Sequence, residues 1–541
     1  MRRTLTATVS VLAAATMVLA ACAPPTAEDV EETDTTEEEP TEEDGAADDD
    51  ADGDETDDAD DAASGPLVIA RTGDVDSLDP HRATAFQSVQ ALEQIYETLF
   101  EHDEDLNVVG SLVEEWEYSE DGETLQLQLT PDATFHDGSP LTSDDVVASL
   151  ERVLDEDSGS VARANILSIA AAEADGDHGV TLNLERADAT LPAALTSTNT
   201  AIAPAAAIES GTIENEPLGS GPFLFDEWSQ GDVFRMVRYD DYWRGTPALE
   251  GIEIRVVPDE GSVEAGLTAG QYHLGVITDP IVISQIDESE LDVQREPALA
   301  YRVLQLNTEV APFDDPMVRQ AIACAVDRQE LVDSALLGEG EVTGPFTAPA
   351  WRTDAYAGLP CDGPDTDLSL ELLADAGYED GFSFEMIVMT GGYETAVNEA
   401  QSLQSQLSAI GIEADIQQLE TSVYVDRWLA TDYEGAVALN GGNPDPHLMY
   451  ARYFTSDGNL QSVATYSSEE LDQLFADGEA ETDPAARAAI YAEISERLLE
   501  ASPWIWTANG FEYRVLRPEV SGFQSLSTGS MKGLRDASLH G

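Results

Sequence analysis

The chain has 541 residues and a mass of 58.0 kDa, and hydrophobic residues make up 42% of it. A chain of this length is too long for one hydrophobic core of ordinary size, so we expect two or more domains. The hydrophobic content is sufficient to build these cores, which excludes a wholly disordered chain. The charge is one-sided, with 24 Lys and Arg against 108 Asp and Glu and a formal net charge of -84. Such a surface repels phosphates and anionic headgroups, which excludes nucleic-acid binding as the main function.

The first 21 residues predict an export signal. Arg2 and Arg3 form a short basic start, and residues 7–19 are nearly all apolar or small. That run is too short to span a bilayer but suits the apolar region of a signal peptide. It leads into Leu-Ala-Ala-Cys22, which resembles the bacterial lipobox. We therefore expect Cys22 to be acylated as the first mature residue; the alternative is an ordinary secretory signal.

Residues 22–65 predict a disordered acidic tether. Asp and Glu dominate the stretch 28–61, which contains no Lys, Arg, aromatic residue or Leu. Such a composition cannot bury enough apolar surface to offset the entropy lost on ordering. The opening half of a calcium-binding EF-hand loop occurs at residues 48–53, but the twelfth position is Ala59 instead of an acid. A solvated tether is thus favoured over a calcium site.

The remaining chain predicts a mixed α/β fold. Residues 66–72 and 124–129 have the apolar spacing of strands, and Thr142 with Asp145 forms a capping-box pattern that opens a helix. Asp315 and Pro316 predict a helix start, with Val318, Ile322, Val326 and Leu331 on one face. Further strands are expected at residues 251–257, 382–389 and 412–419, and further helices at 368–376, 401–410 and 484–499.

A search for catalytic motifs gives no positive result. The chain has no Gly-x-Ser-x-Gly elbow, no phosphate-binding P-loop and no Ser-x-x-Lys. The seven His do not pair at metal-ligand spacing, so neither a metal nor a cofactor is expected. His136, in Phe-His-Asp-Gly, is interpreted as a turn residue and not a catalytic one. The sequence predicts no enzyme, although a hydrolase with an unrecognised site stays open at this stage.

Two cysteines remain once Cys22 is assigned to the lipid. Cys324 and Cys361 would both lie outside the cell, where a disulfide is permitted. Closing that loop would stabilise the fold by roughly 3–4 kcal/mol in the chain-entropy model. The alternative is two separate buried thiols, because Cys324 lies on an apolar helix face.

Several segments together resemble the family 5 solute-binding proteins of bacterial ABC importers. The segments are residues 134–154 (TFHDGSPLTSDDVVASLERVL), 219–247 (GSGPFLFDEWSQGDVFRMVRYDDYWRGTP), 304–327 (LQLNTEVAPFDDPMVRQAIACAVD), 372–378 (LLADAGY) and 404–412 (QSQLSAIGI). No one of these motifs is specific, but they occur in the family's order and span most of residues 66–541. We interpret them as scaffold and not as ligand contacts.

The resemblance implies an α/β, two-lobe periplasmic-binding-protein-like fold of the class II type, with an extra subdomain in lobe I. Lobe I would comprise residues 66–300, including the extra subdomain at 106–217. Lobe II would comprise 301–504, and the segment 505–541 would return to lobe I. A ligand would be enclosed between the lobes by a hinge motion. The crossings between lobes are expected near residues 301–307 and 504–511.

Residues 437–450 (VALNGGNPDPHLMY) resemble the family's pocket loop, and Asp445-Pro446 match its end. Peptide-binding members carry an Asp, which pairs with the peptide's α-amino group, at the position occupied here by Gly442. This departure leaves a sugar, a modified peptide or another polar solute as alternatives to an ordinary peptide. Ligand contacts are expected from Asn440, Gly441, Gly442, Asn443 and Asp445, although a rigid turn without ligand contact is the alternative for Asn443 and Asp445.

Weaker ligand-contact candidates lie on three other loops. They are His81, after the first strand; Thr198 and Asn199, after an expected helix; and Tyr393, at a strand end. The resulting prediction is a monomeric, lipid-anchored receptor at the outer face of the membrane, which captures a polar organic solute and delivers it to the transmembrane subunits of an ABC permease. A structural surface protein is a further alternative, but the sequence shows no internal repeats to support it.

Overall fold

The computed structural model describes residues 65–352, 361, 363–391, 393 and 395–540. The predicted export signal, Cys22 and all but the last residue of the predicted tether lie outside the described residues. Among the described residues, no helix combines the length and hydropathy that a membrane span requires.

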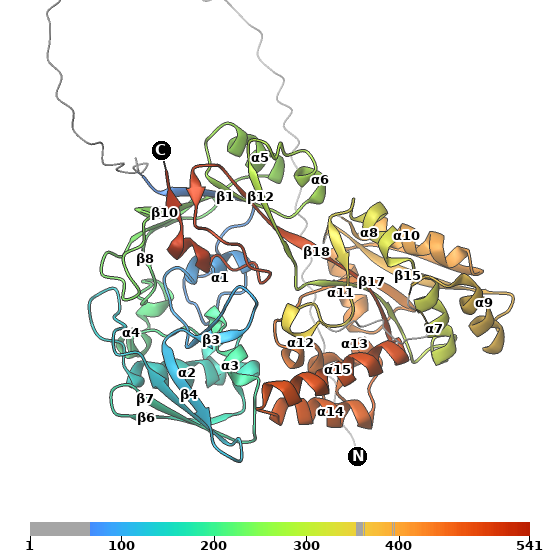
Figure 1. The fold of residues 1–541 in the computed structure, drawn as a ribbon, viewed down its shortest axis with the longest axis horizontal. Coiled ribbons are helices and arrows are strands. Elements are labelled where there is room, and N and C mark those ends of the chain that lie inside the picture. Colours follow the sequence, from blue (N-terminus) through green and yellow to red (C-terminus); the bar gives the residue numbers. More distant parts are fainter. Residues whose placement is uncertain (1–64, 353–360, 362, 392, 394, 541) are drawn as a thin grey trace, which may run out of the picture. The chain divides into compact units, whose positions relative to one another are not determined.

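The largest sheet of the described residues has 12 strands (Figure 1). Its two parts are joined through the long strand β18 (Trp504–Leu516). One part of the sheet, which we call the lobe I sheet, contains β1 (Leu67–Arg71), β8 (Phe223–Ser229), β9 (Val233–Arg238), β10 (Gly251–Val256), β11 (Leu274–Ile277) and β12 (Asp292–Pro297). The other part, the lobe II sheet, contains β13 (Tyr301–Leu306), β14 (Gly340–Val342), β15 (Phe382–Thr390), β16 (Ile412–Glu420) and β17 (Gly435–Asn440).

Strand β18 belongs to both sheets. Its first residues pair antiparallel with β13, where Ile505 lies opposite Leu304, and with β14, where Gly510 lies opposite Gly340. Its later residues pair with β12, from Phe511 opposite Pro297 to Leu516 opposite Asp292, and with β11. The chain therefore passes between the two sheets at the β12–β13 connection and again within β18.

A separate four-stranded antiparallel sheet lies within the first half of the chain, in the order β4 (Val113–Tyr118), β5 (Thr124–Leu129), β7 (Gly179–Leu184), β6 (Ile169–Asp175). It shares a core with α2 (Ser143–Leu154), whose Val146, Leu150 and Val153 are buried. The predicted capping box opens this helix, since Asp145 Oδ2 accepts from the backbone N of Thr142 at 2.9 Å. Short elements complete this half of the chain: β2 (Phe100–His102), β3 (Val108–Gly110), α1 (Phe86–Leu92), α3 (Leu191–Ala194), α4 (Ala205–Ser210), α5 (Glu260–Thr268) and α6 (Pro280–Ile283).

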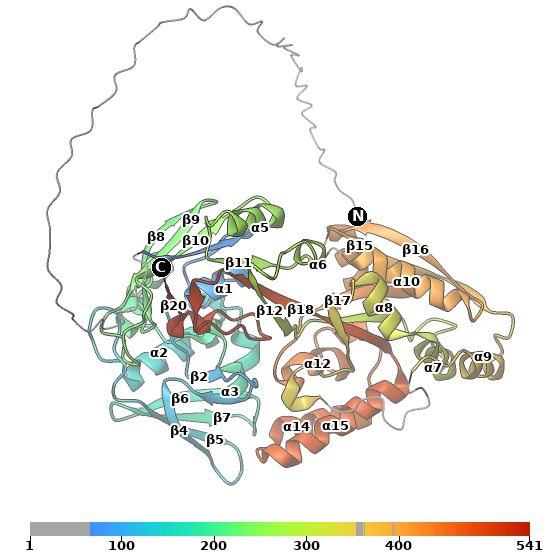
Figure 2. The same cartoon turned by 45° about the horizontal axis from the view of Figure 1, so that its top comes forward.

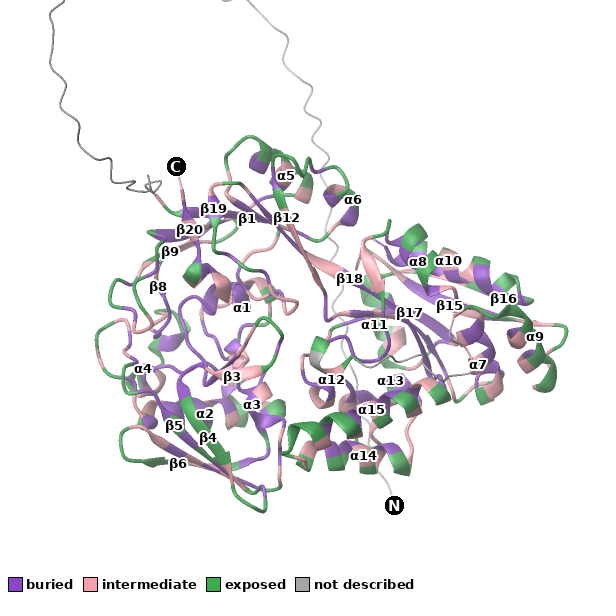
Figure 3. Ribbon diagram, viewed as in Figure 1, coloured by how far each residue is buried: buried purple, intermediate pink, exposed green. Residues whose placement is uncertain are grey.

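Burial differs strongly between individual strands. β17 is buried at nearly every position, whereas β4 of the smaller sheet exposes most of its residues (Figure 3). Helices α14 (Glu469–Ala480) and α15 (Pro484–Ala501) lie side by side (Figure 2). The other helices here are α7 (Pro316–Ala325), α8 (Arg328–Ala335), α9 (Thr366–Asp375), α10 (Ala396–Ser408), α11 (Thr421–Leu429), α12 (Pro446–Phe454) and α13 (Gln461–Ala464).

The C-terminal segment packs with the beginning of the folded chain. Leu516, Phe523 and Met531 lie in the same buried cluster as Leu67 and Ile69 of β1. The short strands β19 (Val520–Ser521) and β20 (Ser538–Leu539) pair with each other here. This packing brings residues 526–532 beside α1, since the backbone N of Met531 donates to the buried carboxyl of Glu93.

Most predicted elements are confirmed to within a few residues, but one is wrong. The expected helix, which opens at Asp315-Pro316 and carries Leu331, is two helices, α7 and α8, which are interrupted at Val326 and Asp327. Val326 has an extended backbone, and the Asp327 side chain accepts from the backbone N of Glu330 at 3.0 Å, as an N-cap does. The chain therefore starts a new helix while Leu331 still reaches the common core.

The motif at residues 219–222 holds two segments in close contact. A Cβ on Gly219 would lie 2.0 Å from the carbonyl oxygen of Ile95, and one on Gly221 would lie 2.6 Å from that of Gln94. The backbone N of Gly221 donates to the Ile95 carbonyl at 2.9 Å. These glycines are required because the two backbones touch, which fits the prediction that this motif is scaffold.

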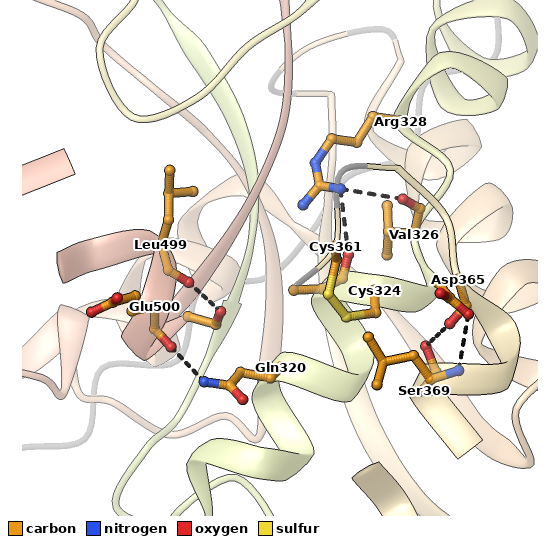
Figure 4. Close-up of a disulfide and its surroundings, with 12 residues drawn as sticks. Gln320, Cys324, Val326, Arg328, Cys361, Asp365, Ser369, Leu499 and Glu500 are labelled. Atoms are coloured by element: carbon orange, nitrogen blue, oxygen red, sulfur yellow. Dashed lines mark hydrogen bonds between the residues drawn. A yellow bond between two sulfur atoms is a disulfide. The ribbon is translucent and has the colours of Figure 1, made fainter. Parts of the chain in front are cut away.

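Cys324 and Cys361 form a disulfide in the structure, with Cα atoms 5.1 Å apart (Figure 4). It joins α7 to the segment that precedes α9. The same region is held by backbone hydrogen bonding, because the N of Asp365 donates to the Cys324 carbonyl at 2.8 Å. Asp365 then caps α9 by accepting from the backbone N of Leu368 at 2.9 Å.

Candidate functional site

A cavity of about 530 Å³ lies between segments connected to the lobe I sheet and segments connected to the lobe II sheet. One wall comes from α1, β2, the loop at residues 196–198 and the C-terminal segment; the other comes from the β12–β13 connection, the loop after β17 and Glu512 of β18. The lining residues are Phe86, Val89, Gln90, Glu93, Glu101, His102, Thr196, Ser197, Thr198, Leu299, Ala300, Gly441, Gly442, Asn443, Pro444, Glu512, Leu526, Ser527, Thr528, Ser530 and Lys532.

The predicted pocket loop contributes Gly441, Gly442 and Asn443 to this cavity. A Cβ on Gly442 would lie 1.9 Å from the carbonyl oxygen of Leu299, whereas one on Gly441 would meet no atom within 4 Å. The loop therefore rests directly against the β12–β13 connection at Gly442. Asn443 shapes the turn, because its Oδ1 accepts from the backbone N of Asp445 at 2.9 Å.

Asp445, which is predicted as a ligand contact, is held in an ion pair. Its carboxylate accepts from Arg487 Nη1 at 2.7 Å and Nη2 at 3.1 Å, and both side chains are buried. It also caps α12 by accepting from the backbone N of His447 at 2.9 Å. Asp445 does not line the cavity described above but lines the adjoining one described below, so its role as a ligand contact stays a prediction.

The other predicted contacts divide into those that reach the cavity and those that do not. Thr198 lines it. His81 is fully buried, with Nε2 2.9 Å from the Ala201 carbonyl and Nδ1 2.8 Å from Arg152. Asn199 donates to the carbonyls of Pro80 and Ala83 at 2.6 and 3.0 Å. Both side chains bond backbone carbonyls of neighbouring loops and do not line this cavity, so their role as ligand contacts stays a prediction.

Two further candidates lie in lobe II away from the lining. Asn440 ends β17 and is buried, and its Nδ2 has no hydrogen-bond partner among the described residues. Tyr393 packs against the lobe II core, with its hydroxyl 3.5 Å from Glu399, and burial raises its pKa well above the ordinary value. Neither residue lines the 530 Å³ cavity.

Three ionisable side chains of the cavity have strongly shifted pKa values. Burial raises the pKa of Glu93 to about 7, against the opposing effects of Lys532 and of the hydrogen bonds from Met531 and Ser530. Burial also acts to raise the pKa of Glu101, but the hydrogen bond from Arg535 and the charges of Lys532 and Arg244 outweigh it and bring the pKa to about 2. Burial, followed by Lys532, lowers the pKa of His102 to about 4.

A second cavity of about 330 Å³ adjoins the first and shares His102 and Pro444 with it. Its walls are more aromatic, with Trp116, Tyr118 and Trp351. Asp445 and Arg487 also line it, and the Arg487 guanidinium lies 5.1 Å from the centroid of the Trp351 ring. The two cavities together give room for a ligand with a polar end and an apolar or planar end.

The described residues do not form a metal centre, since no group of three or more His, Cys, Asp or Glu side chains is placed to hold a metal ion. Another hollow of about 620 Å³ lies on the four-stranded sheet over β4, β5 and β7. We do not favour it as the site because it is more open and touches neither the loop after β17 nor the segments that connect the two sheets.

Sequence reasoning missed the wall that α1, β2 and the C-terminal segment supply. Glu93, Glu101, Glu512 and Phe86 belong to none of the family-like motifs. In a chain with 108 acidic residues, a glutamate carries no signal of its own. Lys532 was detectable, because it is the only lysine in the sequence.

The comparisons with known proteins identify the class. Residues 107–461 match the family described as bacterial extracellular solute-binding proteins, family 5, middle. The match covers more than half of the chain, so the chain belongs to family 5 of the bacterial extracellular solute-binding proteins.

Curated relatives align with this chain over most of its length. The chain is similar to the oligopeptide-binding protein AppA of Bacillus subtilis, with 26% identity over 486 residues, which covers 85% of this chain and 89% of that protein. It is also similar to the glutathione-binding protein GsiB of Escherichia coli K12, with 27% identity over 469 residues, which covers 82% and 88% respectively.

Solved structures agree with the fold. HbpA2 from Haemophilus parasuis aligns with a TM-score of 0.79 and 24% identity, covering 87% of this chain and 99% of that one. AgaA from A. tumefaciens R10, in complex with agropinic acid, aligns with a TM-score of 0.70 and 26% identity, covering 88% and 99%. The fold is thus the two-lobe α/β fold of this family.

Members of the family are extracellular or periplasmic receptors. They bind peptides or small solutes and deliver them to ABC permeases. The chain is therefore a substrate-binding receptor of an ABC importer and not an enzyme. The hydrolase and surface-protein alternatives are set aside on this ground.

Proposed function

We propose that this receptor is lipid-anchored at the outer face of the cell membrane and captures a peptide-like or other polar organic solute in the cavity between its lobes. The observation that carries the proposal is the 530 Å³ cavity, whose lining comes from α1, β2 and the C-terminal segment on one side and from the loop after β17 on the other. Closure around such a cavity would seal the solute from water.

The lobe boundaries are part of the proposal. We assign residues 66–300 and 505–541 to lobe I, with 106–217 as its extra subdomain, and 301–504 to lobe II. The pairing of β18 with β13 at residues 504–508 and with β12 at residues 511–516 supports the expected crossings near residues 301–307 and 504–511. Two crossings restrict the lobes to one hinge motion.

The solute class rests on the composition of the cavity and on the departure at Gly442. An acid at that position, which peptide-binding members of the family use for the ligand's amino group, is missing here. The relatives named above bind oligopeptide and glutathione, and AgaA binds agropinic acid, so similar scaffolds accept different polar solutes. We therefore propose a polar solute whose recognition does not depend on an acid at position 442.

The experiment is a thermal-shift screen of the mature protein in 1 M NaCl against glutathione, di- and oligopeptides, agropinic acid and sugars. A ligand at about 100 times its Kd should stabilise the folded protein by about 3 kcal/mol. Mass spectrometry should then recover the ligand intact. Stabilisation by none of these classes would contradict the proposed solute class, and recovery of a cleaved ligand would contradict the receptor function.

The lipid anchor has its own test. Expression of the full chain in a bacterium that processes lipoproteins should give a membrane-bound protein whose N-terminal peptide begins at an acylated Cys22. Cys22→Ser should release the protein into the medium or the periplasm. An unacylated Cys22 on a soluble wild-type protein would support the ordinary secretory signal instead. Light scattering on the soluble form should give the mass of a monomer.

A further inference from the structure

One end of helix α14 lies against the part of the chain that carries the four-stranded sheet (Figures 1 and 2). Glu479, the last but one residue of this helix, makes two kinds of bond there. Its carboxylate accepts from Arg186 Nη2 at 2.7 Å and, through both oxygens, from Arg186 Nε at 3.2 and 3.3 Å. Its backbone carbonyl accepts from the backbone N of Ala189 at 2.6 Å. The contact thus joins a residue that we assign to lobe II with two that we assign to lobe I.

The lobe I side of this contact is held in a fixed shape. Asp188, which lies in the same loop, is buried, and its carboxylate accepts from Ser168 Oγ at 2.5 Å and from the backbone N of Thr190 at 2.9 Å. Its carbonyl accepts from the hydroxyl of Tyr118 at 2.7 Å. The loop that carries the two contacting residues is therefore held in place by lobe I itself.

The lobe II side of the contact is joined to the pocket loop. Arg487 Nε donates at 2.9 Å to the carbonyl of Gly478, which precedes Glu479, and the same guanidinium holds the pocket loop through Asp445. His447 Nε2 lies 4.0 Å from Glu479 Oε1, beyond hydrogen-bond distance, so it does not compete for the carboxylate. The end of α14 and the loop after β17 are therefore tied together.

Apolar contacts accompany these polar bonds. Leu448 of α12 packs against the buried cluster of the four-stranded sheet, and Leu106 shares a buried cluster with Ala348. Leu106, Ala189 and Trp351 line the cavity of about 330 Å³. The surface on which the two lobes touch therefore borders the ligand site, and separating the lobes there would expose both the cavity and these side chains.

We propose that Arg186, Ala189 and Glu479 form a latch, which holds the lobes in their closed form. Bending at β18 and at the β12–β13 connection keeps the chain continuous there, whereas non-covalent bonds between the lobes elsewhere must break when the lobes separate. The affinity for a solute depends on the fraction of receptor in its binding-competent form, so the latch strengthens binding without touching the solute. This proposal rests on the proposed function and deepens it, because it names residues that control how long the solute is retained.

A covalent trap tests the latch without a ligand. From standard bond lengths and the 2.6 Å hydrogen bond, the Cα atoms of Ala189 and Glu479 are at most about 6.5 Å apart, within the range that a disulfide spans. Mature protein with Ala189→Cys and Glu479→Cys should form this bridge under mild oxidation. Its radius of gyration should then be smaller than that of Glu479→Cys alone, which lacks the same acid but cannot close the bridge. Absence of the bridge, or equal radii of gyration, would overturn the proposal.

Binding kinetics test what the latch does for the solute. Glutathione is the first probe, and otherwise the compound that stabilises the protein most in the thermal-shift screen. Arg186→Gln and Glu479→Gln should each weaken its affinity about two- to fivefold, as expected for a partly exposed ion pair, and the double variant should lose no more than either single one. The dissociation rate should rise by that factor at an unchanged association rate, because only the closed form has the latch. An affinity that neither variant changes would contradict the latch.

Controls separate the latch from folding, from direct ligand contact and from the proposed function. Glu156→Gln, which breaks an exposed ion pair with Arg163 within lobe I, should leave the affinity and the dissociation rate unchanged. Melting temperatures should show that both latch variants remain folded; if one does not, the bridged protein decides. A second ligand of different chemistry should lose the same factor, and a loss confined to one ligand would overturn the proposal. If no solute binds while the bridged protein is compact, the proposed solute class fails and the latch stands.

Discussion

At the scale of single residues, Glu93 places a carboxyl group in a buried environment that disfavours its charged form. Its carboxyl group is buried beside α1 and is held by Met531 and Ser530 of the C-terminal segment. Burial raises its pKa from 4.5 to about 7, even with Lys532 nearby. The folded protein therefore retains a proton that the unfolded chain releases between these two pH values.

This shift predicts a pH-dependent stability difference for Glu93→Gln. Since the folded-state pKa of the acid is raised, the wild type loses stability as pH rises from 4.5 to about 7, by about 3 kcal/mol in total. The neutral glutamine does not undergo this loss. Denaturant unfolding in 1 M NaCl at pH 4.5 and pH 8 should show the variant gaining about that amount relative to wild type. A pH-independent difference would contradict the buried carboxyl.

Asp445 and Arg487 give the second residue-scale prediction. Their side chains are 4% and 8% exposed, so removing one charge leaves the other buried and unpaired. Asp445→Asn should lower the free energy of unfolding by about 3–5 kcal/mol. Glu156→Gln breaks the Arg163 pair, whose side chains are 32% and 81% exposed, and should cost less than about 1 kcal/mol. Equal costs for the two variants would show that the pair does not hold the pocket loop.

At the scale of elements, the loop after β17 owes its position to Gly442. Its backbone lies against the carbonyl of Leu299 in the β12–β13 connection, where a Cβ does not fit. The adjacent Gly441 faces open space. The two glycines therefore form a matched pair for testing whether loop position controls ligand binding.

Gly442→Ala should displace this loop, lower stability by about 1–3 kcal/mol and weaken ligand binding at least tenfold. Gly441→Ala should change neither quantity appreciably, because its added methyl group meets no atom within 4 Å. Calorimetry with a ligand from the thermal-shift screen and denaturant unfolding measure the two effects. Similar results for both alanines would mean that the loop does not bear on the site.

Most helices and strands could be predicted from the sequence, but the break between α7 and α8 could not be recognised from the apolar pattern. Strands such as β5 and β16 were predictable because their apolar positions alternate, and α9 and α10 because Gly377 and Gly411 end them with positive φ angles. The break between α7 and α8 was missed because Val326 and Leu331 kept the apolar spacing. A second capping pattern, Asp327 with Glu330, was the available signal.

The site was predictable only in part. The pocket loop follows a recognisable family pattern, and three of its five named residues line the cavity. His81 and Asn199 do not line this cavity, because a polar residue after a strand can equally well bond backbone carbonyls of a neighbouring loop. The α1 and C-terminal wall could not be predicted, since it depends on packing between residues more than 400 positions apart, such as Glu93 and Met531.

At the scale of the whole molecule, the acidic surface predicts a requirement for salt. The chain carries 108 acidic and 24 basic residues, and salt near 1 M reduces the Debye length to about 3 Å, which removes most of the repulsion between surface charges. We infer that the protein is adapted to a saline environment. The melting temperature should therefore rise from 0.1 to 3 M NaCl, by about 2 °C or more per kcal/mol of relieved repulsion.

Sucrose at equal osmolality is the control for this prediction. It stabilises proteins by exclusion from their surface and does not screen charge. The rise in melting temperature should be clearly larger in NaCl than in sucrose. Equal rises, or no rise in NaCl, would contradict the inference of charge repulsion.

Closure of the two lobes over an intact solute is the central claim, and small-angle X-ray scattering tests it most directly. The mature protein should be measured in 1 M NaCl, alone and with a saturating ligand from the thermal-shift screen. The account predicts that the radius of gyration falls on ligand binding and returns to its former value once the ligand is dialysed away unaltered. An unchanged radius of gyration with ligand demonstrably bound would contradict it.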